Sequence, residues 1–169
     1  MTAVRPDPRA VVGEVVDPEM PMLTLADLGV VRDVVQDGDS DDDTVTVTIT
    51  PTYSGCPAIE AMRADLRTRL NEAGYPRVTV RTVLSPPWST DWISERGRRA
   101  LAEHGIAPPA KTSSPGPVAL SLAAPSTAVR CPRCDAPVTE ELSRFGPTAC
   151  TSLRRCPSCR EPFEHMKDI

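Results

Sequence analysis

The sequence predicts a small α/β sandwich followed by a proline-rich linker and a C-terminal, cysteine-rich ribbon. Three observations predict this architecture. Valine and threonine alternate over residues 44–50, which is typical of a half-buried strand. An apolar stripe with three- and four-residue steps follows, as in a helix that packs on a sheet. Two Cys-x-x-Cys pairs lie near the C-terminus, each able to present two sulfur atoms on one loop.

Composition limits the possible classes of protein. The 169 residues suffice for one domain with attachments or two small ones. Nineteen prolines and few aromatic residues indicate a modest core with long irregular connections. The net charge of −4 offers no general field for nucleic acid. No apolar run is long enough for a membrane span, and the first eight residues lack the apolar stretch of a signal peptide.

We therefore expect a cytoplasmic protein. In that reducing compartment, six cysteines are more consistent with metal ligands or reactive thiols than with disulfides.

The first elements form a helix and a hairpin. Residues 9–16 are expected to be helical until Pro18 disfavours helical geometry at the preceding residue. A helical turn over 24–29 ends at a glycine, and a β-branched run at 30–35 predicts a strand that pairs antiparallel with 44–50. The acidic residues between the strands resemble the start of a calcium loop. They lack the closing glutamate of an EF-hand, so we interpret them as a solvated hairpin loop.

A helix and a third strand complete the sandwich. The helix is expected to begin at Cys56, with Pro57 in its first position, and to end before Gly74. Alternation over 78–84 predicts the third strand. The order is thus helix–β–β–α–β, with the helices on one face of the sheet.

A tryptophan-containing extension follows the third strand. Trp88 and Trp92 are the only tryptophans, and Ser89 or Thr90 can cap a helix that continues to residue 105. Two interpretations remain open. The tryptophans form either a hydrophobic lid over the sheet or, together with Asp91, a surface for a partner or ligand. The expected domains are residues 9–106, a linker of Pro, Ala and Ser at 107–129, and a ribbon at 130–169.

The ribbon carries a strong metal-binding signal. Two Cys-x-x-Cys knuckles are separated by 21 residues, enough for a hairpin that brings four thiolates to one tetrahedral ion. Zn²⁺ suits four sulfurs, and rubredoxin-like iron is the chemical alternative. The ribbon has little apolar core, so the metal would supply its stability. The expected ligands are Cys131, Cys134, Cys156 and Cys159.

Other residues of the ribbon are less informative. Cys150 is left over, either as a buried small residue or as a second reactive thiol or alternative ligand. His165 is a poorer ligand candidate than the knuckle cysteines, and His104 is expected to interact with a helix C-terminus. Seven Lys and Arg residues nearly balance six Asp and Glu over 130–169, so a structural or protein-docking role is favoured over nucleic-acid binding.

The loop around Cys56 is the other candidate site. A thiol at a helix N-terminus tends toward the thiolate, which binds metals and attacks electrophiles. The alternative is a small apolar residue tucked under the sheet, since buried cysteine is common.

Two groups of residues carry family resemblances. Asp17-Pro18-Glu19 with Pro21, the Val/Thr hairpin and Thr52-Tyr53-Ser54-Gly55-Cys56-Pro57 resemble the MIP18 family, also called the domain of unknown function 59. Members of that family take part in iron–sulfur protein maturation. The segments 84–93, 105–109 and 145–150, together with the ribbon, resemble the PaaD-type (PaaJ) subunits of the bacterial phenylacetyl-CoA 1,2-epoxidase system.

These resemblances imply a non-catalytic accessory subunit in aerobic phenylacetate degradation. It would assist iron–sulfur cluster assembly in the epoxidase, especially in the subunit that is an iron–sulfur flavin reductase. The resemblance places a functional thiol at Cys56, an acidic motif at Asp17 and Glu19, and a structural Zn²⁺ on the four knuckle cysteines. Cys56 would hold iron or a cluster transiently. Because a cluster usually needs four ligands, the client or a homodimer partner would supply the others.

Two other functions remain in view. A cysteine-dependent enzyme that processes acyl-CoA esters would need a base near Cys56. The two histidines lie outside the compact α/β unit, so Asp17 or Glu19 would have to act instead. A zinc ribbon could also serve only as a protein-docking module, without metal transfer.

Overall fold

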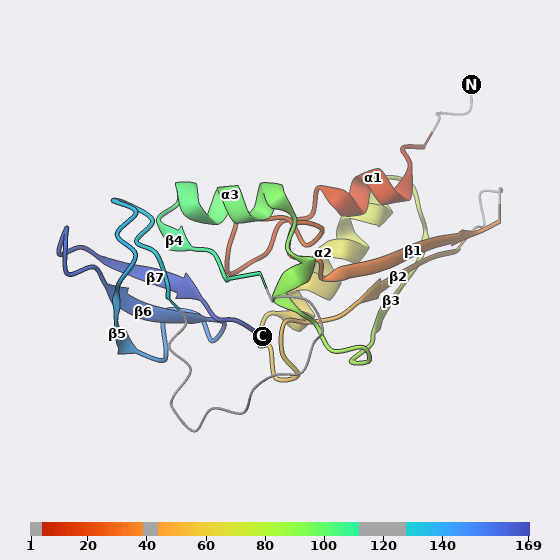
Figure 1. Cartoon of the computed structure of the whole chain (residues 1–169). Helices are drawn as coiled ribbons and strands as arrows, with labels where there is room; N and C mark the ends of the chain where they lie inside the picture. The colour runs from red at the N-terminus through yellow and green to blue at the C-terminus, as the bar shows by residue number, and fades with distance from the viewer. Residues whose placement is uncertain (1–4, 39–43, 112–127) are drawn as a thin grey trace. The chain divides into compact units, whose positions relative to one another are not determined.

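The computed structural model describes residues 5–38, 44–111 and 128–169, and the chain divides into two compact units, Met1–Gly97 and Arg98–Ile169 (Figure 1). The predicted mixed α/β class is confirmed. We expected the first domain to reach residue 106. The structure divides the chain earlier because Ile106–Ala107, strand β4, pairs with a strand of the C-terminal sheet. In the described residues, no helix is both long and apolar enough to cross a membrane.

The first unit is built on a three-stranded sheet. Its strands are β1 (Val31–Asp37), β2 (Thr44–Ile49) and β3 (Arg77–Thr82), in the order β1-β2-β3. The predicted β1–β2 hairpin is confirmed, and β3 pairs parallel to β2. The three apolar residues of β2 are fully buried, as their alternation predicts. The acidic loop, residues 39–43, lies outside the described residues.

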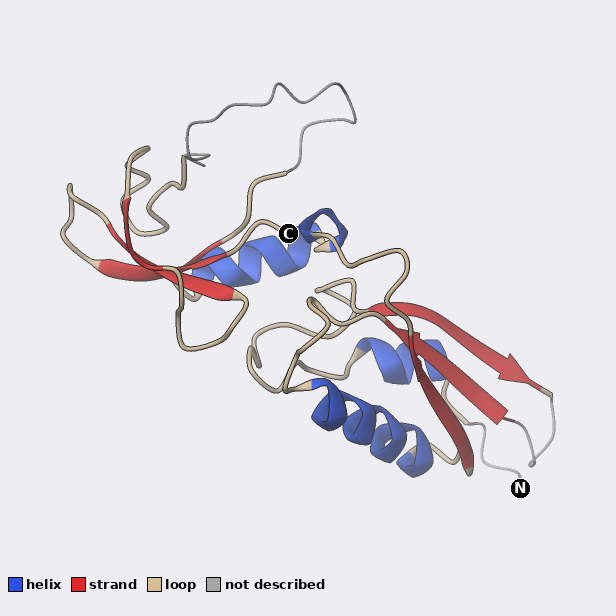
Figure 2. Cartoon of the chain, turned by 90° about the horizontal axis from the view of Figure 1, so that it is seen from below, coloured by secondary structure: helices blue, strands red, loops and turns tan. Residues whose placement is uncertain are grey.

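Two helices lie on the same face of this sheet (Figure 2). They are α1 (Pro8–Gly13) and α2 (Ile59–Glu72), which contact each other, and α2 buries Met62, Leu66 and Leu70 along one stripe. Gly74 ends α2 with a φ of +95°. The N–H of the next residue donates to the carbonyl of Leu70, which caps the helix as predicted.

The predicted start of α2 is wrong. The helix begins at Ile59, so Cys56 lies outside its first turn. Pro57 disfavours helical geometry at Cys56, and the Cys56 carbonyl instead accepts from the N–H of Ile59 at 3.3 Å, closing a turn ahead of the helix. The argument that a helix dipole activates this thiol therefore loses its geometric basis.

The expected single helix after Ser89 is also wrong. A 3-10 turn, Thr90–Trp92, is separated from α3 (Glu95–Glu103) by Ile93, whose ψ is 125°. The hydroxyl of Ser94 accepts from the N–H of Gly97 at 2.9 Å and so caps α3 separately. The separate cap at Ser94 thus divides a segment that its apolar pattern predicts to be one helix.

The tryptophan extension folds back onto the turn at 24–29. The indole N–H of Trp88 donates to the carbonyl of Leu28 at 2.8 Å. Gly29 has a φ of +68°, and a Cβ atom there would lie 2.6 Å from the Cβ of Trp92, so only glycine fits. Asp27 joins the two segments. Its buried carboxylate accepts hydrogen bonds from Thr24, Ser94 and Arg96.

The second unit contains a four-stranded sheet, ordered β4-β7-β6-β5. Besides β4, its strands are β5 (Glu140–Ser143), β6 (Thr151–Arg155) and β7 (Pro162–Met166). A small cluster of buried residues forms its core: Ala107, Val129, Cys131, Cys156 and Phe163. Ala107, expected in the linker, is therefore part of this unit, and residues 112–127 of that linker lie outside the described residues.

We predict that Asp27→Ala lowers the free energy of unfolding of the first unit by about 2–3 kcal/mol, because hydrogen bonds to a charged group are lost. Burial raises the pKa of Asp27, but bonds from Thr24 and Ser94 and the charge of Arg96 outweigh this and lower it below 3.8. The stabilisation is thus present above pH 3.8 and fades as the pH falls through the folded pKa.

Urea denaturation followed by tryptophan fluorescence measures this effect at pH 7 and at acidic pH values that decrease from 3.8, where the difference between wild type and the variant should shrink. Asp33→Ala is the control, since Asp33 is half exposed and its ion pair with Arg9 is long, at 3.4 Å. Equal stability of the two variants at neutral pH would contradict the role of Asp27.

Candidate metal centre and the Cys56 loop

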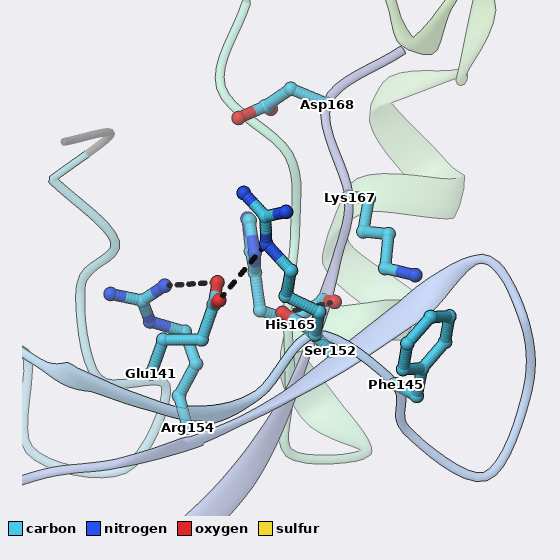
Figure 3. Close-up of a pocket in the computed structure, with 8 residues that line it drawn as sticks. Glu141, Phe145, Ser152, Arg154, His165, Lys167 and Asp168 are labelled. Atoms are coloured by element: carbon cyan, nitrogen blue, oxygen red, sulfur yellow. Dashed lines mark hydrogen bonds and ion pairs between the residues drawn. The ribbon is translucent and has the colours of Figure 1, made fainter. Parts of the chain in front are cut away.

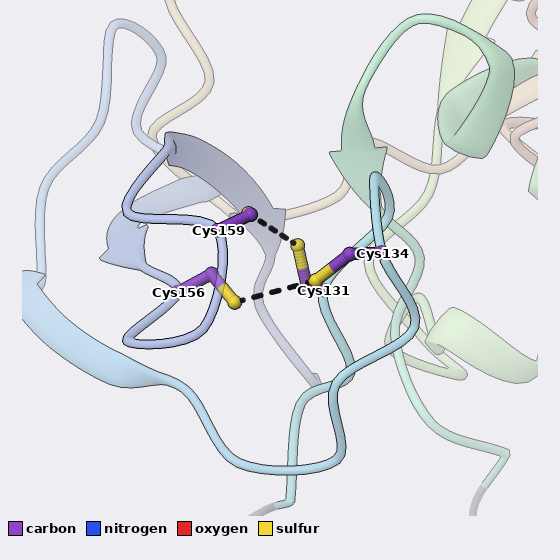
Figure 4. Close-up of side chains that lie close together, drawn as sticks. All are labelled: Cys131, Cys134, Cys156 and Cys159. Carbon is purple, nitrogen blue, oxygen red and sulfur yellow. Dashed lines mark hydrogen bonds between the residues drawn. The ribbon is translucent and has the colours of Figure 1, made fainter.

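The four knuckle cysteines converge as predicted (Figure 4). Their sulfur atoms all lie within 4.8 Å of one another. The Sγ atoms of Cys131 and Cys159 are 3.7 Å apart, and those of Cys134 and Cys156 are 3.6 Å apart. These separations are far longer than a disulfide bond and suit four thiolates around one tetrahedral ion.

The two knuckles share one backbone design. In each, the residue after the second cysteine donates its N–H to the carbonyl of the first: Asp135 to Cys131 at 2.9 Å and Arg160 to Cys156 at 2.8 Å. Asp135 and Arg160 both adopt positive φ, at 59° and 64°. The turns are therefore closed by main-chain bonds, and the chain itself brings the sulfurs together.

The charges of these sulfurs require compensation. The N–H of Cys159 contributes most to holding the pKa of Cys156 at about 6, below its usual 9. The N–H of Ala136 lowers the pKa of Cys134, but the bond to the Cys156 sulfur and the other thiols raise it to about 12. The thiols thus cannot all ionise alone, because neighbouring thiolates repel one another, and a bound dication would remove this conflict.

Cys150 lies outside this centre. Among the described residues, the cysteines 131, 134, 156 and 159 are the only group of three or more His, Cys, Asp or Glu side chains whose ligand atoms converge. Cys150 is buried, and its sulfur lies 3.2 Å from the hydroxyl oxygen of Thr148. This placement agrees with the interpretation of Cys150 as a buried small residue.

Neither histidine belongs to the centre. His104 Nδ1 lies 2.8 Å from the carbonyl oxygen of Ala100 in the last turn of α3, which agrees with the expected interaction at a helix C-terminus. His165 is buried on β7, and this burial lowers its pKa.

Cys56 lies in a loop between the central strand and α2. Its side chain is 7% exposed, and its N–H donates to the carbonyl of Tyr53 at 3.2 Å. The same loop begins at Thr50, whose N–H donates to Val30 at 2.8 Å. The hydroxyl oxygen of Thr50 is buried and has no hydrogen-bond partner among the described residues. Buried hydroxyls are usually paired, so this one is an exception among the described residues.

The acidic motif forms a turn. One carboxylate oxygen of Asp17 accepts from the N–H groups of Glu19 and Met20, both at 2.8 Å. Burial raises the pKa of Asp17, and these two bonds offset part of that rise. Glu19 is half-buried. These two carboxylates and Cys56, all in described segments, do not form a convergent group of metal ligands.

The tryptophans separate into two environments. Trp88 is 4% exposed, which favours the interpretation as a hydrophobic lid for this residue. Trp92 is half-buried, with the guanidinium carbon of Arg32 3.6 Å from its ring centroid, and Asp91 is exposed. Only Asp91 and Trp92 of the three thus remain at the surface, where the partner role stays a prediction.

Sequence reasoning did not find a groove on the C-terminal sheet, lined in part by Phe145 and His165 (Figure 3). The available signal was the segment 145–150. It carries part of the family resemblance, but its local pattern does not predict a groove. Its side chains gather only when β5, β6 and β7 lie side by side.

Each of the two units matches a family of known proteins. The iron–sulfur cluster assembly protein family matches residues 9–83, and the PaaD zinc beta ribbon domain matches residues 115–167. A protein of Escherichia coli K12, described as one of the subunits of 1,2-phenylacetyl-CoA epoxidase, is 42% identical over 95% of this chain and 90% of its own length. The chain belongs to the PaaD family. The matched ribbon includes all four converging cysteines, which therefore form a site for a structural metal such as zinc.

A solved structure supports the fold of the first unit. A DUF59 domain from Bacillus anthracis is 30% identical, with a TM-score of 0.50 over 56% of this chain and 87% of that one. The MIP18-like architecture predicted from the hairpin and the Cys56 loop is thereby confirmed.

We predict that Cys156→Ser, or removal of the metal with a chelator, unfolds the second unit. Two ligand cysteines, Cys131 and Cys156, belong to the buried cluster of that unit, so loss of the metal also disrupts its packing. Elemental analysis should show loss of zinc, and the amide NMR signals of residues 128–169 should lose their chemical-shift dispersion. Signals of the first unit should persist.

The matched control is Cys150→Ser, which changes a buried cysteine outside the centre. It should retain one zinc ion per chain. Loss of zinc from this variant, or its retention in Cys156→Ser, would contradict the assignment of the ligands.

Proposed function

We propose that this protein is an accessory subunit of a phenylacetyl-CoA epoxidase that assists iron–sulfur cluster assembly, with the flavin reductase subunit as its main client. Two findings support this proposal. The Escherichia coli relative is described as belonging to such an epoxidase, and the first unit matches a family of iron–sulfur cluster assembly proteins.

The observation that carries the proposal is the separation of Cys56 from the structural metal centre. Five of the six cysteines lie in the C-terminal unit, where four converge and Cys150 is buried. Cys56 is the one cysteine of the segment that matches the assembly family. A thiol that is not needed for the ribbon is suited to hold iron or a cluster temporarily.

Cys56 would share this cargo with another molecule. A cluster usually needs four ligands, and the described residues around Cys56 do not offer a convergent set. The client, or a second copy of this chain, would supply the remaining ligands, which favours release. Asp17 would support the turn that carries Glu19.

The alternative of a cysteine-dependent acyl-CoA enzyme has weaker support. Such an enzyme needs a base that orients and deprotonates the thiol. The carboxylate of Asp17 is already bonded to two main-chain N–H groups. His104 is engaged with a helix carbonyl, and His165 lies in the C-terminal sheet. We therefore propose no catalytic step for this chain.

We predict that Cys56→Ser lowers the iron and acid-labile sulfide content of the reductase subunit when the two proteins are co-expressed. The decrease should be about tenfold or more, since even an outer-shell partner changes metal affinity about tenfold. Electron paramagnetic resonance of the purified reductase provides a second readout.

The control is Cys150→Ser, which should leave the cluster content of the reductase unchanged. Tryptophan fluorescence of Cys56→Ser should match that of wild type, showing that the first unit, which contains both tryptophans, is folded. Full cluster content in the presence of Cys56→Ser would rule out the proposed role.

A further inference from the structure

The segment 145–150 displays an aromatic ring on a closed turn. Phe145 is 75% exposed, yet its main chain is bonded on both sides by Ser143, whose hydroxyl donates to the Phe145 carbonyl at 2.9 Å and accepts from its N–H at 3.1 Å. Gly146 follows, and a Cβ atom there would clash with the side chain of Thr151. The turn therefore requires glycine and holds the preceding ring out from the sheet.

Lys167 orients this ring further. Its ammonium lies 5.0 Å from the ring centroid of Phe145 and donates to the carbonyl of Ala149 at 2.8 Å. A cation at this distance is attracted to the face of the ring. An exposed aromatic side chain that is already ordered loses little entropy when a partner binds.

Phe145 forms one side of a groove with a volume of about 600 Å³, which we call the Phe145 groove. Glu141 stands on the other side with Arg154 beside it, and His165 lies between Glu141 and Phe145 (Figure 3). Ser152 and His165 pair across β6 and β7, and both are buried, so they form its floor. Phe145 is the one apolar residue of its lining, and the others are polar or charged. The face of the Phe145 ring suits one apolar side chain of a partner, and the rest of the lining suits polar groups.

The charges at the Phe145 groove favour an acidic partner. Three cations, Arg144, Arg154 and Lys167, outnumber the carboxylates Glu141 and Asp168. Burial lowers the pKa of His165, so this ring adds no charge near neutral pH. The groove is thus net positive on a chain with a net charge of −4. Opposite charges at such a site raise the association rate and select the partner.

The adjacent strand leaves one edge open. Among the described strands, β5 pairs only with β6. Two apolar residues near this edge are exposed, Val138 at 68% and Leu142 at 50%. Proteins usually protect an exposed apolar edge, because it can template pairing with another chain. An edge of this kind beside an aromatic groove is typical of recognition by strand addition.

We propose that the Phe145 groove docks an extended, acidic segment of an epoxidase subunit. The segment runs along the open edge of β5 and inserts an apolar side chain against Phe145, while its carboxylates face Arg144 and Lys167. The identity of the partner rests on the proposed function. The docking surface itself rests on the turn, the groove, the open edge and the charges.

The test measures binding of the purified reductase and oxygenase subunits to the zinc-loaded protein by biolayer interferometry. Phe145→Ala should weaken binding about thirtyfold, as for the central residue of an interface. Arg144→Glu should weaken it most at low salt, because screening reduces electrostatic attraction. Leu84→Ala, which removes a side chain that is 57% exposed in the first unit, is the matched control and should bind like wild type.

Three outcomes would overturn the proposal. Phe145→Ala could bind like wild type, or neither subunit could bind the wild-type protein. Sedimentation of this protein alone could also show a dimer that Phe145→Ala dissociates, which would assign the groove to a second copy.

Cys56→Ser separates this proposal from the cluster-assembly role, because it should bind the subunits like wild type. If it binds normally and the reductase still acquires its cluster, the proposed function fails and the docking surface stands. If Phe145→Ala leaves binding unchanged while Cys56→Ser lowers cluster content, the docking surface fails and the proposed function stands.

Discussion

Mutual repulsion among four sulfur atoms is the constraint on which the C-terminal unit depends. The chain brings them within 4.8 Å through two knuckles with matching main-chain bonds, although so many thiolates cannot coexist without a cation. Binding of a metal such as zinc relieves that repulsion beside a small buried cluster to which two of the ligand cysteines belong. The sheet, its open edge and the Phe145 groove belong to the same unit as this centre.

The first unit depends on ordinary burial instead. The three buried apolar residues of the central strand and the apolar stripe of α2 form its core, and the Cys56 loop connects these two elements. Asp27 then attaches the tryptophan extension to the same unit through bonds from Thr24, Ser94 and Arg96. The structural metal site and the proposed cargo thiol therefore belong to different units, and under the proposed function the ribbon would keep its ion while Cys56 receives and releases another.

Interactions between residues close in sequence are predictable, and the predictions fail where two local signals compete. The β1–β2 hairpin, the stripe of α2 and the glycine cap at Gly74 follow from periodicity and turn chemistry. Helix α2 starts where its apolar stripe begins but two residues after Pro57, because the N–H of Ile59 closes a three-residue turn on the Cys56 carbonyl before the first helical bond, from Met62 to Ala58. The helix predicted after Ser89 is too long, since Ser94 provides a separate cap.

By itself, the sequence determined the α/β class, the separation of a cysteine-rich unit and the four metal ligands, because periodicity and the Cys-x-x-Cys spacing are properties of short segments. Only the tertiary structure decided that Ile106–Ala107 joins the C-terminal sheet and that Trp88 is buried against Leu28. It alone also assembled the Phe145 groove from three strands. Pairing between strands far apart in sequence depends on which edges and cavities the rest of the fold leaves open, and no local pattern encodes that.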